Sequence, residues 1–168
     1  MVTLPSWIQK ENAQKAEAAR DTDTAAQRRA EAADFMRHRS QVFWDQLTLA
    51  LQFNAQALEK LAGEELHGSV SKSVTGMEHN LHIRVERRSV KHGPDFVWLN
   101  LWYMPGSNFM RCYYLDKAKP NIELIVSGRP GLGRDILAIF GGSPLNADQL
   151  GERVIRHMAE HMRVNRQC

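Results

Sequence analysis

The sequence has few cysteines and no long apolar run. Cys112 and Cys168 are the two cysteines among 168 residues, too few for a disulfide framework. The longest apolar stretch, residues 96–104, is interrupted by Asn100, whereas a membrane-spanning helix needs about 20 apolar residues. The first residues also lack the basic start and apolar segment of a secretory signal. These absences lead us to expect a cytoplasmic protein that does not enter a membrane.

Basic and acidic residues are present in nearly equal numbers. The formal net charge is +3, from 22 Lys and Arg against 19 Asp and Glu, which by itself does not indicate a nucleic-acid-binding protein. The distribution is uneven, because residues 1–66 hold 8 basic and 10 acidic side chains while residues 67–168 hold 14 and 9. The basic excess therefore belongs to the second half of the chain.

Proline and glycine are missing between Ser6 and Ala62, where Ala, Gln, Glu, Lys and Arg dominate, as in long helices. Capping-box patterns at 6–9 and 24–27 divide this stretch into predicted helices over about 6–20 and 24–62. The second would be about 58 Å long, whereas a body of about 100 residues is roughly 35 Å across. We therefore expect an N-terminal helical arm, residues 1–64, that packs with the rest as one globular unit and forms a homo-oligomer, a dimer being favoured.

The second predicted helix carries apolar residues at alternating spacings of three and four, the pattern of a packed or coiled-coil helix. These positions are Trp44, Leu47, Leu51, Asn54, Leu58 and Leu61. The polar Asn54 has two interpretations. It fixes the register between two chains, or it makes a hydrogen bond within its own chain.

After Gly63 the apolar pattern becomes alternating, which predicts β-strands. The expected strands are 81–85, 96–103, 109–115, 122–126 and 136–140, with a possible sixth at 69–74. The connections are too short for crossover helices and predict an antiparallel meander. A capping box at 146–149 begins a last helix that runs to about residue 164 with one apolar stripe. The fold class is therefore α+β, with residues 67–168 forming the sheet and the C-terminal helix.

One face of this sheet combines aromatic and basic side chains. If Leu81, Ile83 and Val85 face the core, the other face carries His82, Arg84, Glu86, Phe96, Trp98, Asn100 and Trp102, joined by Arg111 because its burial is disfavoured. We select Arg84, Trp98, Asn100, Trp102 and Arg111 as candidate ligand- or partner-binding residues.

Three interpretations of this face stay open. Aromatic rings beside cations hold single-stranded nucleic acids by stacking. The same residues would equally bind a protein or line a pocket for a small anionic ligand. Alternatively, the helix over 24–62 covers the face, with Phe35, Phe43, Trp44 and Phe53 packing on Trp98 and Trp102.

A second basic set is a candidate anion-binding site. It consists of Arg87, Arg88 and Lys91 in one turn region, and of Arg129 and Arg134 at the two ends of a glycine-rich loop. Glycines allow a backbone to approach phosphate closely, but this loop lacks the Lys-Ser/Thr ending of a P-loop. A flexible hairpin loop is the alternative.

His157 and His161 belong to an H-x-x-E-H string, which is the zinc motif of the inverted zincins. Because the predicted helix ends near residue 164, we expect no third ligand from a later helix, so the pair stays a candidate for metal binding only.

Cys112 lies among apolar residues and is interpreted as a small core residue. The sequence indicates no catalytic set and no cofactor.

The sequence therefore favours a non-enzymatic binding or assembly module that self-associates and presents the basic, aromatic face to a partner. One alternative is a nucleic-acid-binding protein that uses that face. The other is a small anionic-ligand-binding protein or enzyme with a pocket between sheet and helix.

Overall fold

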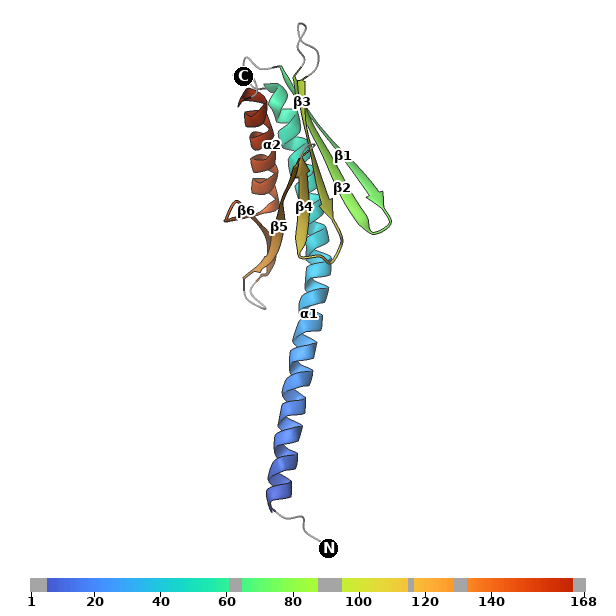
Figure 1. Cartoon of the computed structure of the whole chain (residues 1–168), viewed down its shortest axis with the longest axis vertical. Coiled ribbons are helices and arrows are strands. Elements are labelled where there is room, and N and C mark those ends of the chain that lie inside the picture. The colour runs from blue at the N-terminus through green and yellow to red at the C-terminus, as the bar shows by residue number, and fades with distance from the viewer. Residues whose placement is uncertain (1–5, 61–64, 88–94, 115–116, 129–132, 165–168) are drawn as a thin grey trace. The chain divides into compact units, whose positions relative to one another are not determined.

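The fold is α+β, with a long N-terminal helix, a seven-stranded antiparallel sheet and a C-terminal helix (Figure 1). The computed structural model describes residues 6–60, 65–87, 95–114, 117–128 and 133–164. The helical elements are α1 (Ser6–Ala57), the 3-10 turn η1 (Leu58–Lys60) and α2 (Ala147–Val164). The strands are β1 (Leu66–Thr75), β2 (Glu78–Arg87), β3 (Asp95–Tyr103), β4 (Phe109–Tyr114), β5 (Lys117–Ser127), β6 (Asp135–Phe140) and β7 (Ser143–Leu145).

Helix α1 continues through residues 21–23, where the sequence predicts a break. The hydroxyl groups of Thr22 and Thr24 donate hydrogen bonds to the carbonyl oxygens of Ala18 and Arg20, each at 2.8 Å. A threonine that bonds to the carbonyl four residues earlier remains inside the helix and does not cap a new one. The expectation of two separate helices is therefore wrong.

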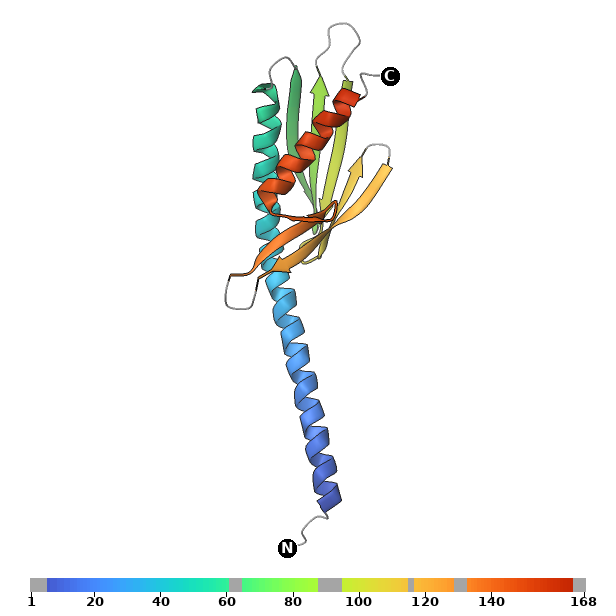
Figure 2. The same ribbon diagram turned by 90° about the vertical axis from the view of Figure 1, so that its left-hand side faces the viewer.

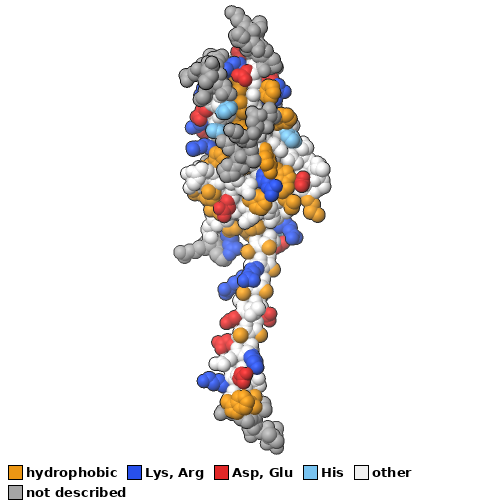
Figure 3. Space-filling model, viewed as in Figure 1, with side chains coloured by type: hydrophobic (Ala, Val, Ile, Leu, Met, Phe, Trp, Pro, Cys, Tyr) orange, Lys and Arg blue, Asp and Glu red, His pale blue; other side chains and the backbone are white. Residues whose placement is uncertain are grey.

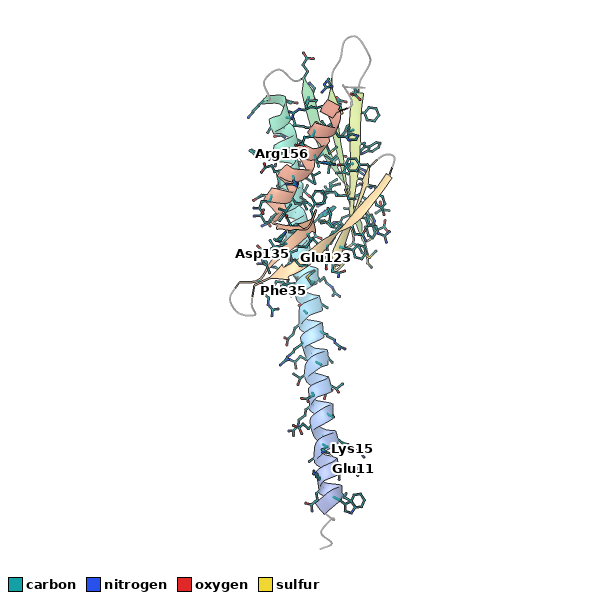
Figure 4. All side chains as sticks on the ribbon, turned by 60° about the vertical axis from the view of Figure 1, so that its left-hand side comes forward. Glu11, Lys15, Phe35, Glu123, Asp135 and Arg156 are labelled. Atoms are coloured by element: carbon teal, nitrogen blue, oxygen red, sulfur yellow. The ribbon has the colours of Figure 1, made fainter. Side chains whose placement is uncertain are left out.

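The chain divides into two compact units, residues 1–35 and residues 36–168. In the first unit, the side chains of residues 9–34 are all exposed. They interact along the helix, as in the Glu11–Lys15 ion pair at 3.2 Å (Figure 4). Acidic and basic side chains are interspersed along this unit (Figure 3). Residues 36–57 of α1 belong to the same compact unit as the sheet.

The sheet follows chain order from β1 to β7, and each strand pairs with the next in antiparallel fashion. The sixth strand that the sequence left open is present as β1, and it pairs with β2 over its full length. The seventh, β7, follows a turn in which Gly141 and Gly142 have φ angles of 62° and 81°. Three residues that include Pro144 give no alternating pattern, which explains why the sequence did not indicate this strand.

One face of the sheet is covered by α2 and by residues 36–57 of α1. Figure 2 shows α2 crossing in front of the strands. The buried residues of the central strands alternate as predicted, with Leu81, Ile83 and Val85 on β2 and Val97, Leu99, Leu101 and Tyr103 on β3. Trp44, Leu47 and Leu51 of α1 pack on this side together with Leu150, Val154, Met158 and Met162 of α2. We call this side the helix-covered face.

The start of α2 confirms the predicted capping box. The backbone N–H of Gln149 donates to Oδ1 of Asn146 at 2.8 Å, and the backbone N–H of Asn146 donates to Oε1 of Gln149 at 3.1 Å. Two N–H groups that the helix leaves without partners are thereby satisfied.

Two glycines allow the helices to approach closely. A Cβ atom at Gly68 of β1 would lie 2.6 Å from the carbonyl oxygen of Ala55 on α1, and one at Gly151 of α2 would lie 2.7 Å from Cβ of Ala50. The backbones could not approach this closely if a side chain stood at either position.

Candidate functional site

The face of the sheet opposite the helices carries the predicted partner-binding residues. On β3, Phe96 and Trp98 are 43% and 42% exposed, while their neighbours Val97 and Leu99 are buried on the other side. We call this side, defined by His82, Arg84, Glu86, Phe96, Trp98, Asn100, Trp102 and Arg111, the aromatic face.

Helix α1 does not pack on the aromatic face. The Trp44 ring stacks on Tyr103, with centroids 5.1 Å apart, and Tyr103 belongs to the helix-covered face. Phe43 is buried as well, whereas Phe53 is 73% exposed. The expectation that these aromatics pack on Trp98 and Trp102 is therefore wrong, because α1 buries its apolar stripe against the other face.

Antiparallel pairing brings the five candidate residues together. Arg84 of β2 is the register partner of Trp98 on β3, and Asn100 lies between His82 and Tyr113. Trp102 of β3 pairs with Arg111 of β4. Each of these positions has the alternation that places it on the aromatic face.

Both arginines of the aromatic face lie over aromatic rings. The guanidinium carbon of Arg84 is 4.9 Å from the centroid of Phe96. That of Arg111 is 5.1 Å from the Trp102 centroid and 5.7 Å from the Phe109 centroid. Cation–π contacts of this kind hold the long arginine side chains along the sheet surface.

The aromatic face is close to neutral in its charge. Arg84 donates a charged hydrogen bond from Nη2 to Oε2 of Glu86 at 2.8 Å, so its charge is partly compensated. A second carboxylate, Glu123 of β5, is the register partner of Phe109 (Figure 4). The basic excess of the second half of the chain is therefore not concentrated on the aromatic face.

A groove of about 410 Å³ lies on the β1 side of the aromatic face. It is lined by Ser69, Ser71, His82, Arg84, Phe96 and Trp98. His82 has a fixed orientation, because its Nε2 shares a hydrogen bond of 3.0 Å with Oγ of Ser73. Sequence reasoning missed the serines because they lie on β1, whose alternation of serine with glycine, valine and lysine is a weak strand signal.

Asn100 occupies the centre of the aromatic face and is half-buried. Its Nδ2 donates to Oδ1 of Asn80 at 3.5 Å, a long hydrogen bond. Its own Oδ1 is buried and has no hydrogen-bond partner among the described residues.

The predicted anion-binding residues have different environments. Arg87 is buried on the helix-covered face, and its Nε and Nη2 have no hydrogen-bond partner within the described part of the chain. Arg134 is half-buried, and its carbonyl oxygen accepts a hydrogen bond from Nη2 of Arg39 at 3.1 Å. Arg88, Lys91 and Arg129 lie outside the described residues.

His157 and His161 lie around the ring of Tyr114 on β4. The ring centroids are 5.8 Å and 6.3 Å from that of Tyr114, respectively. Burial, together with the nearby Cys112, raises the pKa of Tyr114 to about 12. No group of three or more His, Cys, Asp or Glu side chains that could hold a metal ion occurs among the described residues.

Comparison with protein-family models, with curated proteins and with solved structures found no match to this chain. Within the described ranges, neither helix has a stretch that is both long and apolar enough to cross a membrane.

Proposed function

We propose that the protein is a non-enzymatic binding or assembly module that holds a partner on the aromatic face. The observation that carries this proposal is the exposure of Phe96 and Trp98, at 43% and 42%, beside a groove on a sheet face that the helices do not cover. Exposed large aromatics gathered on one face favour an interaction site. Tryptophan and arginine are also the residue types that contribute most to protein interfaces.

A protein partner fits the aromatic face better than a nucleic acid does. Binding to a nucleic acid relies on cations that neutralise phosphates. Arg84 is paired with Glu86, and Glu123 stands beside Phe109. A protein surface with mixed charges and one protruding apolar side chain would match this arrangement, with the apolar side chain entering the groove beside Phe96 and Trp98.

Affinity capture with the full chain tests whether the aromatic face holds a partner. Any captured protein is then purified, and its direct binding to the chain is measured. Trp98→Ser should remove a partner that the wild type retains. Phe53→Ser is the matched control, because Phe53 is also an exposed aromatic but lies on α1. A partner retained equally by both variants would refute this function.

Titration with single-stranded oligonucleotides tests the nucleic-acid alternative. Stacking on Trp98 and Trp102 would quench tryptophan fluorescence, and the quenching would weaken steeply with salt. We expect no salt-sensitive quenching. A strong effect that Trp98→Ser abolishes would favour nucleic acid over protein.

Self-association is the second part of the proposal. Residues 9–34 are exposed along a single helix, and isolated helices are marginally stable in water, so pairing with another copy would stabilise them. Sedimentation should show an oligomer for the full chain and a monomer for a chain that begins at Met36. A start near His67 would be unsuitable, since it removes Trp44 and Leu47 from the core.

The proposed oligomer interface does not include Asn54. Its Nδ2 donates to the carbonyl oxygen of Ala50 at 2.8 Å, which is a hydrogen bond within its own helix. The interface would therefore be formed by residues of the first unit.

The cytoplasm stays the predicted location, on the grounds of the sequence alone.

A further inference from the structure

A second cavity lies on the other side of the sheet, between α2 and the strands β3 to β6. Its volume is about 380 Å³, within the range of about 300–1,000 Å³ that small-molecule sites occupy. Leu99, Phe140 and Val154 contribute apolar walls, and Tyr114, Arg153 and His157 contribute polar groups. The cavity is separate from the aromatic face, because Leu99 and Val154 belong to the helix-covered face.

The charge around this cavity has one sign. Arg153 and His157 are its basic residues, and no Asp or Glu is found among the described residues that line it. The two are four positions apart on α2, so their side chains are neighbours on one side of the helix. A ligand with a negative group would meet a permanent cation at Arg153 without a competing carboxylate in the lining.

Tyr114 adds a hydrogen-bond donor to the same wall. Its ring meets that of His157 edge to face, with centroids 5.8 Å apart and planes at 75°. Burial raises the pKa of Tyr114 to about 12, so the hydroxyl keeps its proton at neutral pH. The hydroxyl is therefore neutral and does not place a negative charge in the cavity.

The remaining wall accommodates an apolar group. Ile139 and Phe140 are half-buried and present the accessible apolar surface, while Leu99 and Val154, at 1% and 2% exposed, are almost completely covered. A ring or short hydrocarbon chain placed here would lose contact with water, which is favourable at roughly 25 cal/mol per Å². The arrangement of one permanent cation beside apolar walls suits a ligand with a single negative charge.

We propose that this cavity binds a small amphipathic carboxylate. Its carboxylate accepts hydrogen bonds from the guanidinium of Arg153, whose planar donors match a carboxylate geometrically. Its apolar part lies against Ile139 and Phe140. This inference goes beyond the proposed function, because it concerns the opposite face of the sheet and does not require a partner on the aromatic face.

Isothermal titration calorimetry of the full chain with 3-phenylpropanoate tests the ligand class. The probe has about 11 non-hydrogen atoms, for which a dissociation constant below about 1 mM is expected in a matching site. The control ligand, 3-phenylpropan-1-ol, has the same apolar part without the charge. We expect the acid to bind about ten-fold more tightly than the alcohol.

Two arginine variants test the position of the site. Arg153→Gln should weaken binding of 3-phenylpropanoate about ten-fold. Arg156→Gln should leave it unchanged. Arg156 also lies on α2 (Figure 4), but it pairs with Glu152 and lines a different groove. Equal affinity for acid and alcohol, an equal effect of the two variants, or no binding up to about 10 mM would overturn the proposal. Trp98→Ser should not alter this affinity, so the two sites can fail independently.

Discussion

Replacing Gly68 by alanine should destabilise the protein, although alanine is favoured over glycine in a regular strand. The new Cβ would lie 2.6 Å from the carbonyl oxygen of Ala55 and 2.7 Å from its Cα and Cβ. Ordinary contacts begin at 3.4 Å, so β1 and α1 would have to separate by about 0.8 Å. Gly68 does not have a positive φ angle, so the effect comes from this contact and not from backbone strain.

The size of the effect follows from two opposing terms. Overpacking costs about 1–3 kcal/mol, and the upper end applies because two of the three contacted atoms belong to the backbone and cannot rotate away. Alanine recovers roughly 0.5–1 kcal/mol of the conformational entropy that glycine loses on folding. We therefore expect Gly68→Ala to lower the free energy of unfolding by about 2 kcal/mol.

Urea denaturation followed by tryptophan fluorescence measures this change, because Trp44 is fully buried and reports loss of the core. Ser69→Ala is the control, since Ser69 is the next residue of β1 and is exposed on the other face. Its effect should stay within about 0.5 kcal/mol. If Gly68→Ala is as stable as this control, the close approach of β1 and α1 is not real.

Three further substitutions test the packing and the charges of the fold. Gly151→Ala should destabilise the protein, although helix propensity alone predicts a gain of about 1 kcal/mol, because the added methyl group meets Ala50; a gain in the urea midpoint would contradict this contact. Asn146→Ala should cost about 1 kcal/mol by removing the cap that holds Gln149, and an unchanged midpoint would refute the cap. Burial lowers the pKa of His79 below 6.5, so the unfolded chain binds this proton more readily and stability falls as the pH drops through about 6.5. Urea titrations at about pH 7.5 and 5.5 should therefore show a smaller loss for His79→Gln than for the wild type, and equal losses would exclude this role.

The sequence was sufficient to predict which residues share a face of the sheet. Alternation along β2 and β3 is strict, and a slip by one residue would bury Arg84 and Asn100 in place of Ile83 and Leu99. Alternation, together with the cost of burying a charge, also predicted that Arg111 lies on the aromatic face. The capping box at Asn146 was also readable, because its two reciprocal bonds lie within four residues.

The sequence was not sufficient to predict which face α1 covers. Both faces offer aromatic partners, since Tyr103 lies on one and Trp98 on the other, and a helix with buried Trp44 could pack on either. The choice depends on close contacts between distant segments, such as that of Gly68 with Ala55, which no local pattern reveals. The sequence left open a pocket between sheet and helix for an anionic ligand, but it could not identify the lining of the cavity beside Arg153, because these residues come from five separate elements.

The order of the strands also determines when each face becomes protected during folding. Every strand pairs with its neighbour in sequence, so the sheet can grow hairpin by hairpin as the chain is synthesised. The helix-covered face, in contrast, lacks the contacts of Leu150, Val154, Met158 and Met162 until α2 has been made. During synthesis, the helix-covered face therefore exposes more apolar surface than the aromatic face and is the more prone to aggregation. The packing of α2 on this face ends the exposure.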